Sequence, residues 1–223
     1  AKKARIRDSR VVGTRALCEA MASMAERPKV IVCASAIGYY GDRGDAVLTE
    51  LASPGEGFLP EVCSQWETAA EPARAAGIRV VSLRIGVVLS AEGGALSKML
   101  LPFRLGLGGK VGDGSQYMSW VSLVDLVSIA RFAIEEDGLS GPVNAVAPGA
   151  VTNLEFTKAL GRALKRPTLF PLPAFVARLA LGEMADDLLL ASVRVEPAVL
   201  KERGFQFEHP ELAGALDAVL ERG

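Results

Sequence analysis

Histidine and cysteine are scarce in this chain, and their scarcity excludes several kinds of site. One histidine, His209, is present among 223 residues, so a metal site built from several histidines is excluded. A Ser-His or Cys-His catalytic pair would depend on that residue alone. The three cysteines, Cys18, Cys33 and Cys63, are widely spaced and form no C-x-x-C pair. They favour neither a disulfide framework nor a zinc knuckle and are typical of buried thiols in a reducing compartment. We therefore expect a cytoplasmic protein without a metal.

An excess of charge of either sign is also absent. The chain has 25 basic and 26 acidic residues and a net charge of −1. It shows neither a basic cluster for nucleic acid nor a charged tail. Its apolar runs are short and interrupted, so no segment predicts a membrane span. Because 50% of the residues are hydrophobic, the chain can bury a sizeable core. We expect a globular monomer or homodimer whose partner is a small molecule.

The clearest strand pattern lies between Pro28 and Gly41. Residues 30–33 form a short apolar run, which is typical of a strand buried in a parallel sheet. Small residues follow, with the hydroxyl of Ser35 at the predicted carboxyl end of the strand, and then Tyr39 and Tyr40. Ligands of open α/β sheets bind beyond these carboxyl ends. Ser35 therefore either borders a binding site or bonds to the backbone of its own turn, and the residues favour neither alternative.

Strand-like and helix-like segments alternate along the rest of the chain. This order predicts a doubly wound α/β fold with a mainly parallel sheet. One α/β domain is expected over residues 1–168, and a small C-terminal helical subdomain over 169–223. Ser122 is expected to cap one helix, and Thr152 with Glu155 to form a capping box for the next. The strands are expected at 30–34, 78–89, 117–121, 143–145 and 204–207, and the other helices at 1–26, 58–76, 96–105 and from Pro210 onward.

Two helices have predicted buried faces. For the opening helix the apolar spacing selects Ile6, Gly13, Leu17, Met21 and Met24. For the helix after Ser122 it selects Leu126, Ile129, Ala130, Ala133 and Ile134.

Residues 106–114, GLGGKVGDG, are the richest in glycine. They match neither the G-x-G-x-x-G pattern nor a phosphate-binding P-loop, because Lys110 is followed by Val111. The segment is expected to be a loop or a hairpin beside the site.

Several stretches together resemble one family of enzymes. They are 9–14 (SRVVGT), 35–41 (SAIGYYG), 83–90 (LRIGVVLS), 101–109 (LPFRLGLGG) and 204–207 (GFQF), together with the pairs Trp66-Glu67 and Ser119-Trp120. The chain is identified as a member of the atypical extended short-chain dehydrogenases/reductases, a group described as an NAD-dependent epimerase family with a C-terminal domain of unknown function. The stretches span nearly the whole chain.

This resemblance implies a Rossmann-like fold and a nicotinamide cofactor, NADP or alternatively NAD. It also implies that the glycine-rich turn for the pyrophosphate belongs upstream of residue 1, so we expect the sheet to be incomplete at the N-terminus. Without that anchor the chain by itself is expected to bind dinucleotide weakly. Ser35 corresponds to an active-site hydroxyl in related enzymes. The residues implied to contact the cofactor are Arg10, Ser35, Leu59, Ile85, Gly86 and Val87. For Arg10 a surface ion pair is the alternative.

The expected catalytic pair is missing. Related enzymes use Tyr-x-x-x-Lys, in which the lysine lowers the pKa of the tyrosine so that it can transfer a proton. When Glu67 is aligned with the usual acidic residue, Leu59 and Cys63 occupy the two positions. Ser122 also stands where relatives commonly have histidine. The catalytic candidates that remain are Ser35 and Tyr39.

Three functions compete at this point. The first is an NAD(P)-dependent oxidoreductase or nucleotide-sugar epimerase-like protein that acts on an unknown small molecule. The second is an NADP-binding protein with little or no catalysis, acting as a redox-responsive scaffold or regulator. The third is a serine hydrolase, which is weakly supported because G-x-S-x-G is absent and His209 lies in the tail.

Overall fold

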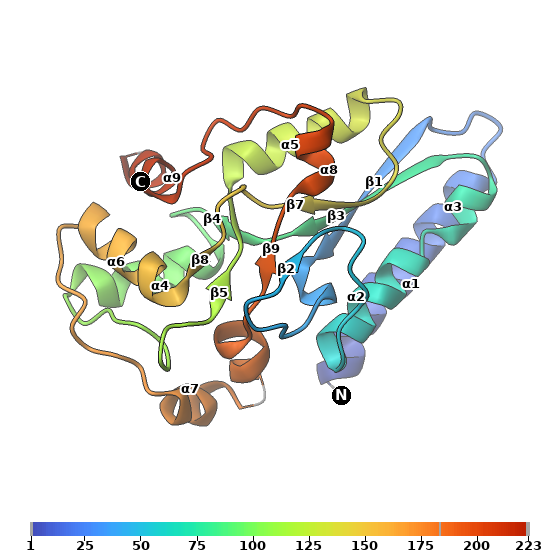
Figure 1. Cartoon of the computed structure of the whole chain (residues 1–223). Coiled ribbons are helices and arrows are strands. Elements are labelled where there is room, and N and C mark those ends of the chain that lie inside the picture. Colours follow the sequence, from blue (N-terminus) through green and yellow to red (C-terminus); the bar gives the residue numbers. More distant parts are fainter. Residues whose placement is uncertain (1, 183, 222–223) are drawn as a thin grey trace.

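The centre of the molecule is a parallel sheet of three strands in the order β1-β3-β7. In this computed structural model, which describes residues 2–182 and 184–221, the strands are β1 (Val30–Ala36), β3 (Arg79–Ile85) and β7 (Gly141–Ala145). The strands predicted at 30–34 and 143–145, and the first part of the strand predicted at 78–89, are therefore present and parallel. The sheet and its flanking helices form a Rossmann-like α/β fold (Figure 1).

Helices cover both faces of this sheet. In Figure 1 one group lies on one side of β1 and β3, and the other group lies on the opposite side. Alternate residues of β1 serve the two faces, since Ile31 packs against Cys18 while Val32 packs in the cluster around Ile129. The first group is α1 (Lys2–Ala22), α2 (Phe58–Thr68) and α3 (Glu71–Ala75), and the second is α5 (Leu123–Glu135) and α8 (Ala198–Glu202).

The predicted strand over 78–89 is interrupted, and this is a correction. It divides at Gly86 into β3 and β4 (Val87–Leu89), and β4 pairs with β6 (Trp120–Ser122) in a separate parallel sheet. A Cβ at Gly86 would lie 2.8 Å from the carbonyl oxygen of Ser119, so only glycine fits this crossing.

Two further small sheets occur. In one, β5 (Tyr117–Met118) pairs with β8 (Val151–Thr152). The prediction of a single strand at 117–121 is therefore also wrong, because β5 and β6 belong to two different sheets. In the other, β2 (Val47–Leu48) pairs with β9 (Arg194–Val195).

A second core lies beside the small sheets. Its largest buried side chains are Trp120, Phe103 and Phe156. It is enclosed by the helices α4 (Gly94–Arg104), α6 (Asn153–Ala163) and α9 (Leu212–Glu221). The remaining helical segments are η1 (Ile37–Tyr39), α7 (Ala174–Leu181) and η2 (Asp186–Leu190). The predicted boundary between a main domain and a C-terminal subdomain at residue 168 stays a prediction.

The predicted helix caps are confirmed. Ser122 accepts a hydrogen bond from the backbone N–H of Asp125 at the start of α5. Thr152 and Glu155 form the capping box of α6. The residues that the structure describes include no helix long and apolar enough to cross a membrane.

Several helix boundaries and faces differ from the prediction. The helix α1 ends at Ala22, so Met24 lies beyond it; Leu17 on the helix is 56% exposed and Met24 is 51% exposed, whereas Cys18 is buried. The buried stripe therefore runs through Cys18, because the sheet lies on that side of the helix. On α5, Ile134 is likewise 55% exposed.

Three other elements differ. The predicted helix over 58–76 is two helices, since Pro72 begins a new one. The last helix begins at Leu212 rather than at Pro210. Residues 204–207 form no strand; instead Phe205 packs edge-on against Phe132 and Phe207.

Candidate functional site

The hydroxyl of Ser35 points into the protein. The residue is 3% exposed, and its Oγ donates to Oε1 of Glu67 on α2 at 2.7 Å. The same carboxylate accepts two hydrogen bonds of 2.9 Å from Nε and Nη2 of Arg84. Ser35 thus lies at the carboxyl end of β1, as predicted, but its hydroxyl is engaged by a buried ion pair.

The ion pair continues into a chain of buried polar groups. Arg84 Nη1 donates to the hydroxyl of Tyr40 at 2.9 Å, and Tyr40 donates to Oδ1 of Asn144 at 2.6 Å. Burial raises the pKa of Tyr40, and the bonds to Arg84 and Asn144 only partly oppose this. Burial alone would lower the pKa of Arg84, but hydrogen bonds with Glu67 and Tyr40 raise it above its usual value. Arg84 therefore stays a cation and Tyr40 a neutral phenol.

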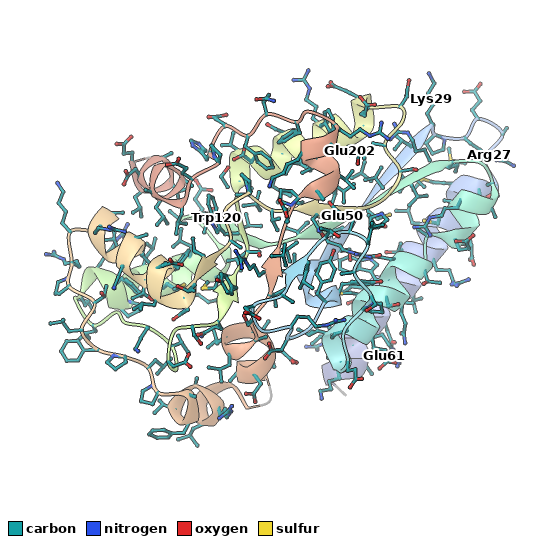
Figure 2. All side chains as sticks on the ribbon, viewed as in Figure 1. Arg27, Lys29, Glu50, Glu61, Trp120 and Glu202 are labelled. Atoms are coloured by element: carbon teal, nitrogen blue, oxygen red, sulfur yellow. The ribbon has the colours of Figure 1, made fainter. Side chains whose placement is uncertain are left out.

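Glu50 closes this network at its far end. Its Oε1 accepts from the backbone N–H groups of Asn144 at 3.0 Å and Val199 at 3.3 Å, which ties the segment after β1 to β7 and α8. Its Oε2 has no hydrogen-bond partner among the described residues. Figure 2 shows Glu50 in the middle of the molecule, whereas Arg27, Lys29 and Glu61 lie at the periphery.

Sequence reasoning did not assign a role to this network. One signal was available, because Arg84 interrupts an apolar strand and a buried arginine requires a partner. No sequence pattern identifies that partner, since Glu67 lies on a different element.

Tyr39 lies directly against Arg84. The guanidinium carbon is 3.5 Å from the centroid of the Tyr39 ring, which is a stacked cation–π arrangement. Its phenolic oxygen makes no hydrogen bond with the part of the chain that the structure describes. The structure therefore brings the two catalytic candidates, Ser35 and Tyr39, to the same guanidinium–carboxylate pair.

Leu59 and Cys63 lie on α2 and face the backbone of Gly38. A Cβ at Gly38 would be 3.6 Å from Leu59 Cβ and 3.9 Å from Cys63 Sγ. Burial, together with the negative charge of Glu67, raises the pKa of Cys63 to about 11. The thiol is neutral at physiological pH, so it cannot replace a lysine that lowers the pKa of a neighbouring tyrosine.

Arg10 lies beside this group. Its charge acts on Cys63, its Nη1 donates to the carbonyl of Ile6 at 2.9 Å, and its guanidinium carbon is 5.4 Å from the Trp66 ring. Among the described residues it makes no ion pair, so the surface-pair alternative is not observed. Its proposed contact with a cofactor stays a prediction.

The predicted cofactor loop of Ile85, Gly86 and Val87 is the junction between β3 and β4. Gly86 donates to the carbonyl of Ala145, and Val87 donates to the carbonyl of Ser119 at 2.8 Å. The close contact that requires glycine at position 86 is with the backbone of Ser119 in the same chain. The two aliphatic side chains beside it are half-buried.

Ser122, Asp125 and His209 also meet, but not as a hydrolytic triad. Ser122 Oγ donates to Oδ2 of Asp125 at 2.7 Å, and the backbone N–H of His209 donates to the same oxygen at 3.1 Å. A triad needs the histidine ring between the two other groups. This arrangement anchors the chain before α9 and gives no support to a serine hydrolase.

A pocket of about 500 Å³ lies beyond the carboxyl end of β1. It is lined by the segment after Tyr40, the end of the glycine-rich loop, α7 and Ser192. Among the described residues no group of histidine, cysteine, aspartate and glutamate side chains is placed to hold a metal ion.

Comparison with known proteins decides the family. The model of the NAD dependent epimerase/dehydratase family matches residues 1–146, and a domain of unknown function matches residues 172–219. The chain belongs to the NAD dependent epimerase/dehydratase family. The resemblance inferred from the sequence is confirmed. An epimerase family protein of Mycobacterium bovis is 48% identical over 214 residues, covering 96% of this chain and 70% of the relative.

Two solved members of the family have the same fold. The human epimerase family protein SDR39U1, crystallised with NADPH, superposes with a TM-score of 0.95 at 35% identity, covering 99% of this chain and 75% of the human one. A nucleoside-diphosphate sugar epimerase of Corynebacterium glutamicum gives a TM-score of 0.82 at 38% identity, covering 98% of this chain and 43% of that one.

Proposed function

We propose that this protein binds NADP(H) and acts as an oxidoreductase of the epimerase/dehydratase family on a small molecule held in the 500 Å³ pocket. One observation carries the proposal, namely the likeness of almost the whole chain to human SDR39U1, whose crystal structure contains NADPH. NAD is the alternative cofactor.

The residues at the carboxyl ends of β1 and β3 fit such a cofactor. Ala34 is exposed and Ala36 and Gly38 are half-buried, so small side chains leave room for a flat ring over this part of the sheet. Arg10, Leu59 and the segment 85–87 are the residues proposed to hold the cofactor, with Ser35 behind them. When bound, the cofactor supplies the hydride.

Reduction of a carbonyl requires a group that gives a proton to the developing oxyanion. The Ser35 hydroxyl already donates to Glu67, whereas the Tyr39 hydroxyl makes no hydrogen bond with the described residues. We assign the donor role to Tyr39. Ser35 is then a positioning residue, because it orients Glu67, which orients the guanidinium stacked on the Tyr39 ring.

Binding of NADP without catalysis is the second candidate. It is favoured by Leu59 and a neutral Cys63 at the positions where relatives have Tyr and Lys. Titration of the protein with NADPH, followed by cofactor oxidation with a panel of carbonyl compounds, separates the two. Binding with oxidation supports the oxidoreductase, and binding without oxidation supports the second candidate. The cytoplasmic location and the oligomeric state stay predictions.

A further inference from the structure

The 500 Å³ pocket is lined in part by residues that are close in the chain to the proposed proton donor, Tyr39, or to a side chain that packs in its cluster. Asp42, which lines it, follows Tyr39 by three residues, and Ser192 lines it next to Val193, which packs in the same cluster as Tyr39. The pocket therefore has the position of a substrate site.

Several side-chain hydrogen-bond donors on its wall are already in use, whereas the hydroxyl of Tyr117 makes no hydrogen bond with the described residues. Both N–H bonds of Gln116 have acceptors, the carbonyls of Val111 at 3.1 Å and Leu189 at 2.8 Å. Ser192 donates to the carbonyl of Gly44. Ser115 likewise donates to Asp113, and Arg178 directs Nε and Nη2 to Asp186, which leaves its Nη1 without an acceptor among the described residues.

Several side-chain acceptor oxygens on the same wall accept no hydrogen bond from the described residues. Gln116 is 7% exposed, yet its Oε1 accepts no hydrogen bond from the residues the structure describes. Asp42 and Asp113 each use only Oδ1, and Asp45 makes no hydrogen bond or ion pair with the described part of the chain. Hydrogen bonds from Ser115 lower the pKa of Asp113, so this carboxyl group stays ionised.

We propose that the pocket binds a polyol or amino-polyol, uncharged or cationic, and that it does not accept a nucleoside diphosphate. The inference rests on the proposed function, because it takes the pocket as the substrate site. Hydroxyl and ammonium groups donate to free amide and carboxylate oxygens. A diphosphate only accepts hydrogen bonds and would meet Asp42, Asp45 and Asp113.

The cationic side chains near the pocket already have contacts of their own within the protein. Arg178 is paired with Asp186 at 2.8 Å. Lys110 is held on a backbone carbonyl beside Asp113, and the guanidinium of Arg194 stacks on the Tyr117 ring at 4.7 Å. A phosphate near these groups would compete with their present contacts and would also meet the carboxylates of Asp42, Asp45 and Asp113 on the wall.

An NMR titration of the whole protein tests the proposal, with D-glucosamine and UDP-glucose as separate probes. D-glucosamine is expected to shift the amide signals of Gly44, Gln116 and Tyr117 in a saturable manner. UDP-glucose is expected to require a concentration at least about tenfold higher for the same shifts. Saturation of these signals by UDP-glucose at equal or lower concentration overturns the proposal, and so does their failure to respond to D-glucosamine.

A pair of matched variants shows whether the carboxylates are responsible. Asp45→Asn is expected to weaken D-glucosamine binding about three- to tenfold, since it removes one nearby charge. Asp137→Asn removes an exposed carboxylate beyond the end of α5, which is paired with Arg79 at 3.9 Å, and is expected to have no effect. Equal effects of the two variants contradict the proposal.

NADPH affinity, measured separately, distinguishes the two possible failures. If NADPH binds neither to this chain nor to one that also carries the expected glycine-rich turn, the proposed function fails whatever the probes do. If NADPH binds and UDP-glucose saturates the pocket, only the ligand class is wrong.

Discussion

Glu67 and Arg84 form a bidentate ion pair inside the protein, in which both N–O distances are 2.9 Å. Their side chains are 14% and 3% exposed. The pair connects α2 to β3, accepts the hydroxyl of Ser35 and supports the ring of Tyr39. The packing of the sheet and the arrangement of the proposed site therefore depend on the same few atoms.

Removing one partner of this pair should strongly destabilise the fold. Glu67→Leu leaves the Arg84 charge buried without its carboxylate, so we expect a loss of about 3–5 kcal/mol in the free energy of unfolding. Urea denaturation measures the loss. The control is Glu135→Ala, which breaks a surface pair with Arg131 and should cost about 0.5 kcal/mol or less. Similar losses in both variants would contradict a structural role for the buried pair.

Ser35→Ala should affect stability as well as activity. The hydroxyl of Ser35 donates to the buried carboxylate of Glu67 at 2.7 Å. Loss of a hydrogen bond to a charged group should cost about 1.5–3 kcal/mol. Thermal and urea unfolding check the value, with Ser23→Ala on the surface as the control. An unchanged midpoint would show that the hydroxyl does not contribute to the network.

Stability should fall in alkaline solution through Cys63. Its folded pKa of about 11 lies above the reference value of 9.0, so the unfolded thiol loses its proton first as the pH rises. The contribution is fully present below pH 9.0 and is lost as the pH approaches about 11, and it amounts to about 3 kcal/mol. Unfolding free energies of wild type and Cys63→Ala across this range should converge. Parallel curves would show that the thiol has an ordinary pKa.

Removing the hydroxyl of Tyr40 should destabilise the protein, whereas removing that of Tyr39 should not. Tyr40→Phe removes the hydroxyl between Arg84 and Asn144, so it should destabilise the fold by about 1–3 kcal/mol. Tyr39→Phe removes a hydroxyl without a partner among the described residues and should leave the unfolding free energy within about 0.5 kcal/mol. Denaturation of both variants makes the comparison. Destabilisation by Tyr39→Phe alone would reverse the two assignments.

The sequence predicted the parts of the molecule that depend on local pattern. The strands β1, β3 and β7 are apolar runs bounded by glycine or proline, and the caps at Ser122 and Thr152 follow short spacing rules. The division at Gly86 was not predictable, because its cause is a contact with Ser119 on another segment. The site was predicted only in part. Tyr40 and Asn144 are bonded across 104 positions, and no local pattern connects them.

Turnover of NADPH by wild type and Tyr39→Phe tests the central claim most directly. The absorbance of NADPH is followed with a panel of ketones, aldehydes and oxidised polyols, and NADPH affinity is measured beside it. The account predicts that wild type oxidises NADPH with at least one of these compounds. It predicts that Tyr39→Phe binds NADPH equally well but turns over about 10²–10⁴ times more slowly. Wild type that binds NADPH and oxidises it with none of them, or Tyr39→Phe with full turnover, would contradict the account.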